Sequence, residues 1–471
     1  MPNRGLVHGL PYGCCVEVPC LVDQVALFQR RDEALKIAFI GAGSVVFTKN
    51  LLTDILSFPE LQETTIALHD IDPERLETAG MMARWTSDQL GAGAKVEEHL
   101  DRRRALEGAH FVVNMVQIGM HQATLLDFEI PKNYGLKQTI ADSMGIGGIF
   151  RGLRTIPFVL DLAAEMRELC PKAMLFNYTN PMSILMEALY TASPEIKSVG
   201  LCHSVPYTAR EIASYIGIEH EDLLYECAGI NHIAWMTRLE VEGEDAYPLL
   251  FAAMEEPEVY AKDKVRFELM RRFGYFLTES SEHNAEYVPY FLRDNELIEL
   301  YDVPVDEYIR RSEENLLQYA QTRRKLLAGE DFSLGRSVEY GSLIMHSLVT
   351  GEARAIYANV KNTGLITNLP EGCCVEVPIL VDGTGLRPCQ VGDLPPQCAA
   401  TCAPHTAVQN LTVRAALEGR RDHVHHAAML DRHAASVLSL EKIAAMVEEL
   451  IEAHGEAMPE GIRNPRAKVR R

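Results

Sequence analysis

The feature that most constrains this fold is a short apolar segment that runs directly into a glycine turn and a helix-like pattern. Lys36–Ile40 is the apolar segment, Gly41–Ser44 is the turn, and Phe47–Leu56 has helical periodicity. A second apolar segment, Thr65–Leu68, follows. A strand, a connecting helix and a second strand usually form a right-handed crossover, which places the two strands parallel in one sheet. The start of the chain therefore predicts a doubly wound parallel sheet with helices on both faces.

The same alternation continues to about residue 205. Further strands and helices are expected at 111–116, 157–169, 173–176, 183–190 and 199–201. Beyond residue 206 the pattern is more helical, with long segments at 305–327 and 438–454, whereas 360–405 reads as ordered loops and short strands. We therefore expect a Rossmann-like domain at residues 36–205 and a second α+β domain at residues 206–471, as in lactate and malate dehydrogenases.

The first 35 residues are expected to be an extension outside both domains. Residues 3–23 match residues 362–382 at 15 of 21 positions without a gap. Solenoid repeats recur several times at a short period, whereas this segment recurs once, and it is too short to bury a core of its own. We interpret the front copy as a partial duplication, or as an artefact of gene assembly or of the start site. We predict that residues 1–33 are dispensable for activity.

Charge and cysteine content narrow the classes of partner. The net charge of −21 argues against a nucleic-acid partner, which needs a basic surface, and against an anionic membrane surface. No apolar run has the length needed to cross a bilayer, and the N-terminus lacks the pattern of a signal peptide. The eleven cysteines, an odd number, favour free thiols in a reducing compartment. We expect a cytoplasmic protein that acts on a small molecule.

The first turn and the end of the second strand predict a dinucleotide site. Gly41, Gly43 and Ser44 stand where glycines let the backbone approach a pyrophosphate and where the next helix stabilises its charge. The third glycine of the usual fingerprint is absent. Asp70 and Asp72 follow the second strand, where a carboxylate binds the ribose hydroxyls and disfavours a 2′-phosphate. These five residues favour NAD over NADP; the alternative is a plain turn beside a solvated acidic loop.

Three polar clusters follow the later strands, and ligands of such sheets bind at strand ends. They are Asn-Tyr-Thr-Asn-Pro at 177–181, Gly-Leu-Cys-His at 200–203 and Gly-Ile-Asn-His at 229–232. Cysteine and histidine coordinate divalent metals, and asparagine can donate to and accept from sugar hydroxyls. A lone Cys-His pair is more often a buried thiol beside a satisfied core histidine. The combination with a dinucleotide site favours a metal and sugar site instead.

With these motifs the chain resembles glycoside hydrolase family four over roughly residues 36–420. The resemblance rests on residues 36–44, on Gly147-Gly148 with Arg151 and residues 153–157, and on the three polar clusters. The second cluster continues as Ser-Val, and this version, together with the block Leu369–Pro378, is most similar to the melibiase-type α-galactosidases of that family. The resemblance implies that homo-oligomers, either dimers or tetramers, are common, but nothing in the sequence identifies an interface.

The resemblance implies a metal site and two catalytic residues. Cys202 and His232 match the two protein ligands of a divalent metal, usually manganese. Tyr287 matches a tyrosine that acts as the base, with Tyr290 as a competing match three residues on. His203 stands where the phospho-sugar members carry an acidic residue proposed as the proton donor. It either takes that role or only orients the leaving group.

The resemblance also implies hydrolysis that depends on NAD and a metal, with no net oxidation. C3 of the sugar is oxidised transiently, the proton on C2 is removed by Tyr287, the glycosidic oxygen leaves by elimination, and water adds at C1. Most glycosidases use two carboxylates instead, and NAD-dependent members are exceptions. A phenol has an unperturbed pKa of about 10, so Tyr287 needs a nearby cation to act as a base.

Asn180, Gln117 and Arg151 are the expected substrate contacts, Asn180 because it matches a substrate-binding asparagine of the family. Members that act on 6-phospho-sugars have an arginine where this chain has Gln117, and a neutral amide favours an unphosphorylated sugar. The alternatives are that Gln117 caps its strand and that Arg151 contacts the cofactor or is a structural donor. An unphosphorylated α-galactoside is expected first, and an α-glucoside, an α-galacturonide or an α-glucuronide second.

Two further function classes stay open on the sequence alone. A lactate- or malate-type dehydrogenase shares the predicted fold but releases NADH and uses no cysteine ligand, so Cys202 beside His203 disfavours it. A non-catalytic NAD-binding regulator would have a degenerate site. The intact set of Cys202, Asn180 and His232 disfavours that class.

Overall fold

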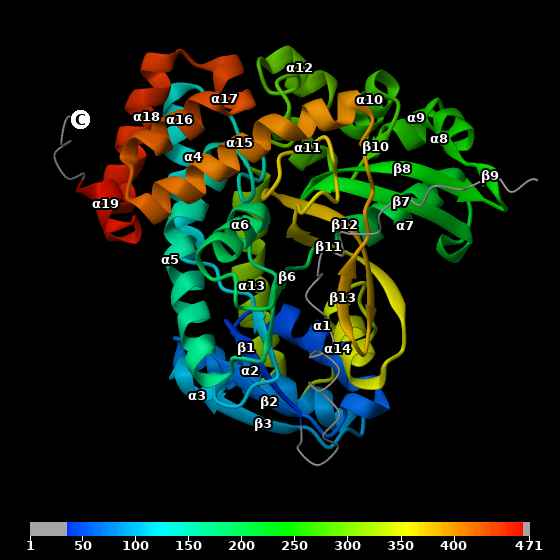
Figure 1. Cartoon of the computed structure of the whole chain (residues 1–471), viewed down its shortest axis with the longest axis vertical. Helices are drawn as coiled ribbons and strands as arrows, with labels where there is room; N and C mark the ends of the chain where they lie inside the picture. Colours follow the sequence, from blue (N-terminus) through cyan, green and yellow to red (C-terminus); the bar gives the residue numbers. More distant parts are fainter. Residues whose placement is uncertain (1–34, 465–471) are drawn as a thin grey trace, which may run out of the picture.

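The computed structural model describes residues 35–464 and places the strands of that range in one 13-stranded sheet (Figure 1). The strands are β1 (Lys36–Ile40), β2 (Thr65–His69), β3 (Lys95–His99), β4 (Phe111–Asn114), β5 (Met174–Asn177), β6 (Ser198–Gly200), β7 (Leu223–Ile230), β8 (Ile233–Val241), β9 (Glu244–Asp245), β10 (Phe276–Leu277), β11 (Arg354–Lys361), β12 (Cys374–Asp382) and β13 (Gly385–Pro388). The expectation for residues 1–33 lies outside the described residues.

The first six strands form the predicted parallel sheet. Their order is β3-β2-β1-β4-β5-β6, and each neighbouring pair is parallel. This is the strand order of two dinucleotide-binding halves that meet between β1 and β4. The predicted Rossmann-like fold is therefore confirmed.

An antiparallel region continues the same sheet. β11 pairs with β6 through Asn359 and Gly200, and the order then runs β11-β12-β7-β8-β10. The second half of the chain thus extends the first sheet, which is the mixed α/β arrangement expected for it. The boundary at residue 205 stays a prediction, because the sheet itself continues across it.

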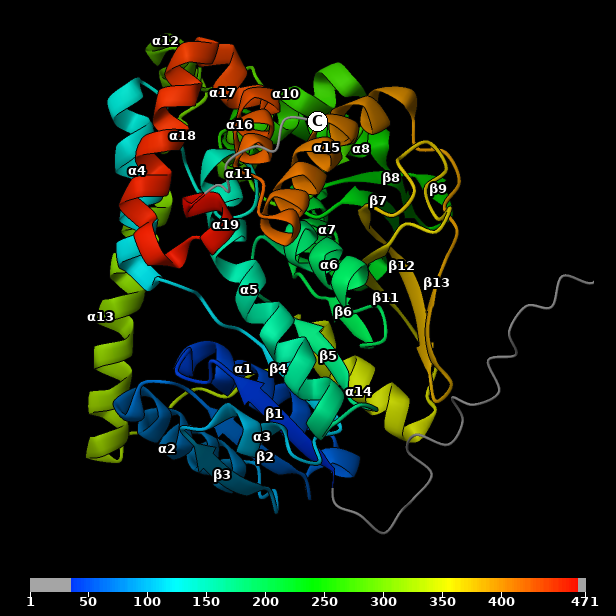
Figure 2. The same cartoon turned by 60° about the vertical axis from the view of Figure 1, so that its left-hand side comes forward.

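Helices cover both faces of the parallel strands (Figures 1 and 2). The longer helices are α1 (Val45–Leu56), α2 (Pro73–Gln89), α4 (Met120–Tyr134), α5 (Gly145–Leu169), α6 (Met182–Ala192), α7 (Ser204–Ile216), α8 (Tyr247–Met254), α10 (Lys264–Phe273), α13 (Glu307–Ala328), α14 (Tyr340–Thr350), α15 (Pro396–Glu418), α16 (Arg421–Leu430) and α18 (Leu440–His454). The short ones are α3 (Arg102–Leu106), α9 (Pro257–Tyr260), α11 (Ser281–Tyr287), α12 (Asn295–Leu300), α17 (Arg432–Val437) and α19 (Glu460–Arg463).

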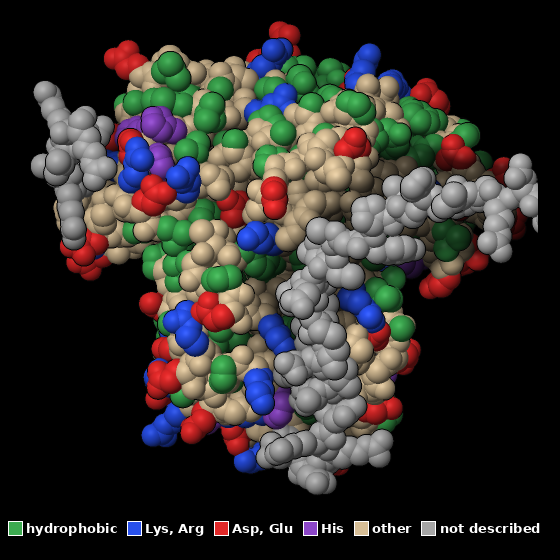
Figure 3. Space-filling view, viewed as in Figure 1, with side chains coloured by type: hydrophobic (Ala, Val, Ile, Leu, Met, Phe, Trp, Pro, Cys, Tyr) green, Lys and Arg blue, Asp and Glu red, His purple; other side chains and the backbone are tan. Residues whose placement is uncertain are grey.

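Alternation along β1 explains why both faces need cover. Ile37 and Phe39 belong to the core that includes α1 and α2, whereas Ala38 and Ile40 belong to the core that includes α3, α5 and α6. A strand buried on both faces reads as a continuous apolar run, as this one does. None of the helices in residues 35–464 is long and apolar enough to span a membrane. On the face in Figure 3, acidic and basic side chains are interspersed.

Two predicted elements differ from the structure. Helix α5 begins at Gly145, twelve residues before the predicted start at Pro157, and it includes both glycines of the pair. In addition, the region 360–405 contains the nine-residue strand β12 and the first part of α15, which is 23 residues long. Local glycine and proline content predicted irregular structure, but burial of apolar faces outweighs such propensities.

Candidate metal and sugar site

The side chains of Cys202 and His232 lie close together, and each residue follows the carboxyl end of a strand. Cys202 follows β6, and His232 lies in the two-residue turn between β7 and β8. The Sγ atom of Cys202 is 3.4 Å from Nε2 of His232. His232 has φ of +65°, a left-handed conformation that non-glycine residues adopt rarely. The imidazole of His232 thus reaches the thiol that follows β6, although β11 and β12 lie between β6 and β7 in the sheet.

Burial makes this pair suited to a cation. Burial is the largest cause of both pKa shifts: it lowers the pKa of His232 to about 4 and raises the pKa of the Cys202 thiol well above its usual range. A neutral imidazole is ready to coordinate, and a buried thiolate needs a compensating positive charge. The donor set, one soft and one borderline ligand, fits a divalent transition metal.

Tyr287 lies on the other side of the same imidazole. Its hydroxyl is 3.2 Å from Nδ1 of His232, and its backbone oxygen is 2.9 Å from Nε2 of His405. Tyr290 is 43% exposed, whereas Tyr287 is 1% exposed. Burial and then the carboxylates of Asp142 and Glu286 raise the pKa of Tyr287 well above its usual range. The geometry favours Tyr287 over Tyr290, and a cation next to it would oppose that rise.

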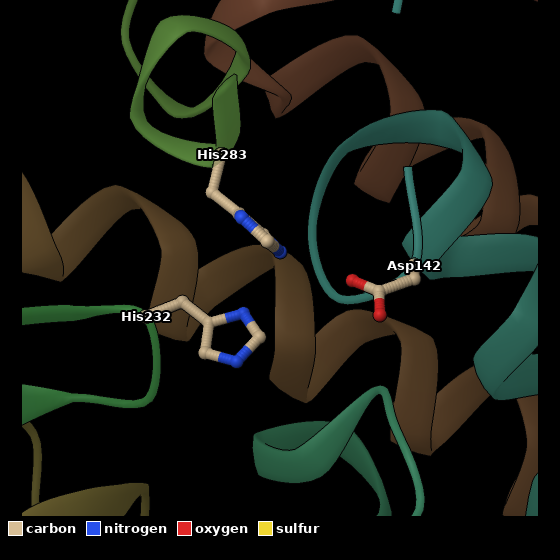
Figure 4. A group of neighbouring side chains, drawn as sticks. All are labelled: Asp142, His232 and His283. Atoms are coloured by element: carbon tan, nitrogen blue, oxygen red, sulfur yellow. The ribbon is translucent and has the colours of Figure 1, made fainter. Parts of the chain in front are cut away.

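Asp142 and His283 also lie beside the imidazole of His232, although the sequence analysis did not predict them as site residues. Figure 4 shows the side chains of Asp142, His232 and His283 pointing toward one another from three separate segments. One ligand atom of each lies within 4.8 Å of the others. His283 and Tyr287 are four residues apart on α11, and this spacing placed both on one helix face. That spacing was the signal available in the sequence.

The side chain of Asn180 is held by a hydrogen bond to Asp142, not by Cys202 or His232. Asn180 donates from Nδ2 to Oδ2 of Asp142 over 2.9 Å, and the hydroxyl of Ser143 donates to Oδ1 over 2.8 Å. Asp142 itself lies in the loop that precedes α5. A Cβ at Gly147 would lie 2.3 Å from the carbonyl oxygen of Ala141, so only glycine lets the helix approach this loop. The glycine pair thus positions Asp142.

Arg151 and Gln117 make structural contacts. Arg151 donates to the backbone oxygen of Asn180 over 3.1 Å and to the hydroxyl of Tyr308 over 3.0 Å. Gln117 donates to the hydroxyl of Thr124 over 3.3 Å. These bonds tie Arg151 to the backbone of Asn180. Within residues 35–464, the side-chain carbonyl oxygen of Gln117 accepts no hydrogen bond from the protein.

His203 pairs with a carboxylate from a distant segment. Its Nδ1 lies 3.3 Å from Oε1 of Glu339, the residue that precedes α14. Partial desolvation opposes protonation, but the hydrogen bond and charge of Glu339 raise the pKa of His203 above its usual value. The side chain of His203 is 49% exposed. A partly exposed imidazole beside a carboxylate can hold a proton for a leaving group.

The dinucleotide residues follow β1 and β2, at the same carboxyl edge of the parallel strands at which Cys202 follows β6. Gly41 has φ of +88°, and Ser44 is exposed at the N-terminus of α1. Asp70 accepts from the backbone N–H of Gly43 over 2.8 Å, and Asp72 accepts from two backbone N–H groups of the first turn of α2. Both carboxylates therefore shape the turn, and their remaining acceptor capacity faces solvent at the end of β2. A glycine cradle at a helix N-terminus fits a pyrophosphate.

Comparisons with known proteins identify the family of the chain. A model of the family 4 glycosyl hydrolases matches residues 36–218, and the model of the C-terminal domain of that family matches residues 227–434. An α-galactosidase of Bacillus subtilis (strain 168) is 44% identical over 429 residues, which cover 90% of this chain and 99% of that protein. The chain belongs to glycosyl hydrolase family 4. The family that the motifs resembled is thus confirmed, and a hydrolase is favoured over a dehydrogenase or a regulator.

Other members of family 4 show the same coverage. An α-galactosidase of Rhizobium meliloti (strain 1021) is 34% identical over 441 residues, 91% of this chain and 90% of that protein. The crystal structure of a putative glucosidase from Bacillus subtilis superposes with a TM-score of 0.81 at 25% identity, covering 88% of this chain and 99% of that one. A 6-phospho-α-glucosidase from gut microorganisms, solved with NAD and Mn²⁺, has the same fold, with a TM-score of 0.76 at 21% identity, covering 91% and 100%.

Proposed function

We propose that this family 4 glycosyl hydrolase cleaves unphosphorylated α-galactosides and needs NAD and a divalent metal, with manganese as the first candidate. The observation that carries the proposal is the Cys202–His232 pair, 3.4 Å apart, with Tyr287 on the opposite ring nitrogen. The 44% and 34% identical relatives named α-galactosidases support the sugar and the anomer. Relatives named α-galacturonidase and α-glucosidase, at 29% and 31% identity, define the alternatives.

Two groups of residues would hold the cofactors. Cys202 and His232 would hold the metal. Gly41, Gly43 and Ser44 would hold the pyrophosphate of NAD, with Asp70 or Asp72 as acceptor for a ribose hydroxyl. When bound, the metal polarises the oxygens of the sugar and NAD accepts and returns a hydride.

Side chains of the protein itself bind the sugar and transfer the protons. Asn180, fixed by Asp142, binds a sugar hydroxyl. Tyr287 removes the proton on C2, because its hydroxyl lies 3.2 Å from the imidazole of His232 and its side chain is buried from solvent. His203, paired with Glu339, holds the proton that the glycosidic oxygen takes as it leaves. General acid and base groups of this kind contribute about 10²–10⁴-fold each.

The neutral residue at position 117 supports an unphosphorylated sugar. Gln117 donates to Thr124 and so presents a carbonyl oxygen, which repels a phosphate and accepts from a hydroxyl. Arg151, which donates to Asn180 and Tyr308, acts as the support for Asn180.

A panel of nitrophenyl glycosides tests the proposal. Release of nitrophenol is expected from the α-galactoside when NAD⁺, Mn²⁺ and a thiol are all present, and it should stop when any one is withheld. The α-glucoside, the α-galacturonide, the β-galactoside and a 6-phospho-α-galactoside should react at least about tenfold more slowly. Faster cleavage of the α-galacturonide or of the phosphorylated sugar would contradict the substrate. Steady accumulation of NADH without nitrophenol would contradict the reaction.

We also propose that residues 36–205 form the NAD-binding domain, that residues 206–471 form the substrate, metal and oligomerisation domain, and that the protein is a cytoplasmic homo-oligomer. Free thiols support the compartment: the eight cysteines of the described residues are all unpaired. Helix α13 supports the oligomer. It has 22 residues, of which Glu307 and Thr322 are buried, and it lies along the outer side of α2 and α4 (Figure 2). Its exposed apolar side chains are Leu316, Leu317 and Leu327, at 41%, 65% and 65%.

Replacing Leu317 with glutamate is expected to convert the oligomer into a smaller species. Burying one leucine contributes about 1.5–3 kcal/mol, and a symmetric interface loses this twice. Light scattering after size-exclusion chromatography measures the mass. Leu440→Glu, equally exposed at 65% but on α18, is the matched control and should leave the mass unchanged. Identical masses for both variants would place the interface elsewhere.

A further inference from the structure

Glu279 is a largely buried carboxylate beside the imidazole of His232. It lies between β10 and α11, and its side chain is 12% exposed. Oε1 lies 3.4 Å from Nε2 of His232, and Oε2 lies 3.3 Å from Nδ1 of His283. Within residues 35–464, these two imidazoles are the ion-pair partners of Glu279. Glu279 also has φ of +75°, a conformation that non-glycine residues adopt rarely.

One nitrogen faces two candidate ligands at once. Nε2 of His232 is 3.4 Å from Sγ of Cys202 and also 3.4 Å from Oε1 of Glu279. A ring nitrogen carries at most one proton, so it cannot donate well to both. Around a single cation with bonds of about 2.0–2.3 Å, adjacent ligand atoms are about 3.0–3.6 Å apart. Both observed separations fall in that range, and all three ligand atoms lie within 4.8 Å of one another.

The side chains around this position agree with a shared cation. A carboxylate, a thiol and an imidazole converge where no lysine or arginine of the described residues forms an ion pair with them. A carboxylate with so little exposure is usually paired or coordinates a metal.

We propose that Glu279 is a third protein ligand of the metal, next to Cys202 and His232. The inference rests on the metal site of the proposed function and adds a ligand to it. It implies that the protein binds the cation before any sugar arrives, through one sulfur, one nitrogen and one oxygen. Two of these ligands are anionic when coordinated. His283 then orients the carboxylate from the side away from the metal, as an outer hydrogen-bond partner does.

The test is the affinity of the NAD⁺-loaded protein for Mn²⁺, measured without sugar by the electron paramagnetic resonance signal of free Mn²⁺. Glu279→Gln should raise Kd at least tenfold more than Asp142→Asn does. Asp142→Asn is the matched control, because it removes the same charge beside the same His232 while leaving the Cys202 side of the ring intact. Equal losses in the two variants would show a charge effect alone and would overturn the assignment.

A measurement on the wild-type protein keeps the proposal independent of the folding of Glu279→Gln, and a spectrum of the variant adds a second test. In a crystal structure of the wild-type protein with Mn²⁺, an oxygen of Glu279 should lie about 2.0–2.4 Å from the ion. A separation beyond about 3 Å overturns the assignment. With Co²⁺, the thiolate-to-metal absorption band should persist in Glu279→Gln while the visible bands change; unchanged visible bands overturn it. A wild-type protein that binds no metal would instead contradict the proposed function.

Discussion

Replacing Cys202 with serine is expected to lower kcat/KM for an α-galactoside by about 10³-fold or more while leaving the fold intact. Serine is similar in size but offers a hydroxyl in place of a thiolate. A hydroxyl is a far poorer ligand than a thiolate for a soft or borderline metal. A Lewis-acid metal contributes several kcal/mol to such a reaction, and about 4 kcal/mol corresponds to about 10³-fold. Nitrophenol release at saturating NAD⁺ and Mn²⁺ measures the loss.

The control for this variant is another buried thiol. Cys170 follows α5 and is 5% exposed, compared with 8% for Cys202, but it precedes β5 and so lies at the amino ends of the parallel strands, whereas Cys202 follows the carboxyl end of β6. Cys170→Ser should keep its activity within about twofold of the wild-type value, apart from any small loss of stability. Circular dichroism should give the same spectrum for both variants. Undiminished, Mn²⁺-dependent turnover in Cys202→Ser would remove Cys202 from the metal site.

Replacing Tyr287 with phenylalanine is expected to lower kcat by about 10²–10⁴-fold with a smaller change in KM. The substitution removes the one atom that lies 3.2 Å from Nδ1 of His232, and general bases contribute about this much. Exchange of the C2 proton with deuterium from the solvent is the direct measurement, because it follows deprotonation without depending on later steps. The exchange should fall in parallel with kcat.

Tyr290→Phe is the matched control, since Tyr290 is three residues away and 43% exposed. It should retain both turnover and C2 exchange. If Tyr287→Phe kept its C2 exchange, the base would lie elsewhere, and His283, one helical turn earlier on α11, would be the next residue to replace. If Tyr290→Phe lost the exchange instead, the competing match to the family motif would be the correct one.

Local sequence patterns were sufficient to predict the first two strands. β1 and β2 were predicted within one residue of their observed ends, because a strand buried on both faces has a continuous apolar signal. The start of α5 was missed by twelve residues. Gly147 and Gly148 lie outside the predicted helix, but in the structure they let α5 approach the backbone of Ala141 and Ser143. Glycine is required there because the loop at Ala141–Ser143 packs against the helix, and the periodicity of the helix itself does not reveal that contact.

The site divides in the same way. Short motifs and the family resemblance predicted Cys202, His232, Asn180 and Tyr287, and the structure brings Cys202, His232 and Tyr287 together. Asp142 and Glu279 were not found. Each lies in a loop with no motif around it, and each reaches the side chain of His232 only through packing of separate segments.

The sequence by itself determined the parallel half of the sheet, the glycine turn at its first strand and the residue types at its strand ends. These depend on periodicity and spacing within a few dozen residues. The tertiary structure decided that β7, β8 and β10 join that sheet through β11 and β12, and that His232 and Glu279 therefore face Cys202. The reason is physical: antiparallel pairing between distant segments sets distances of a few ångströms, and no local pattern encodes them.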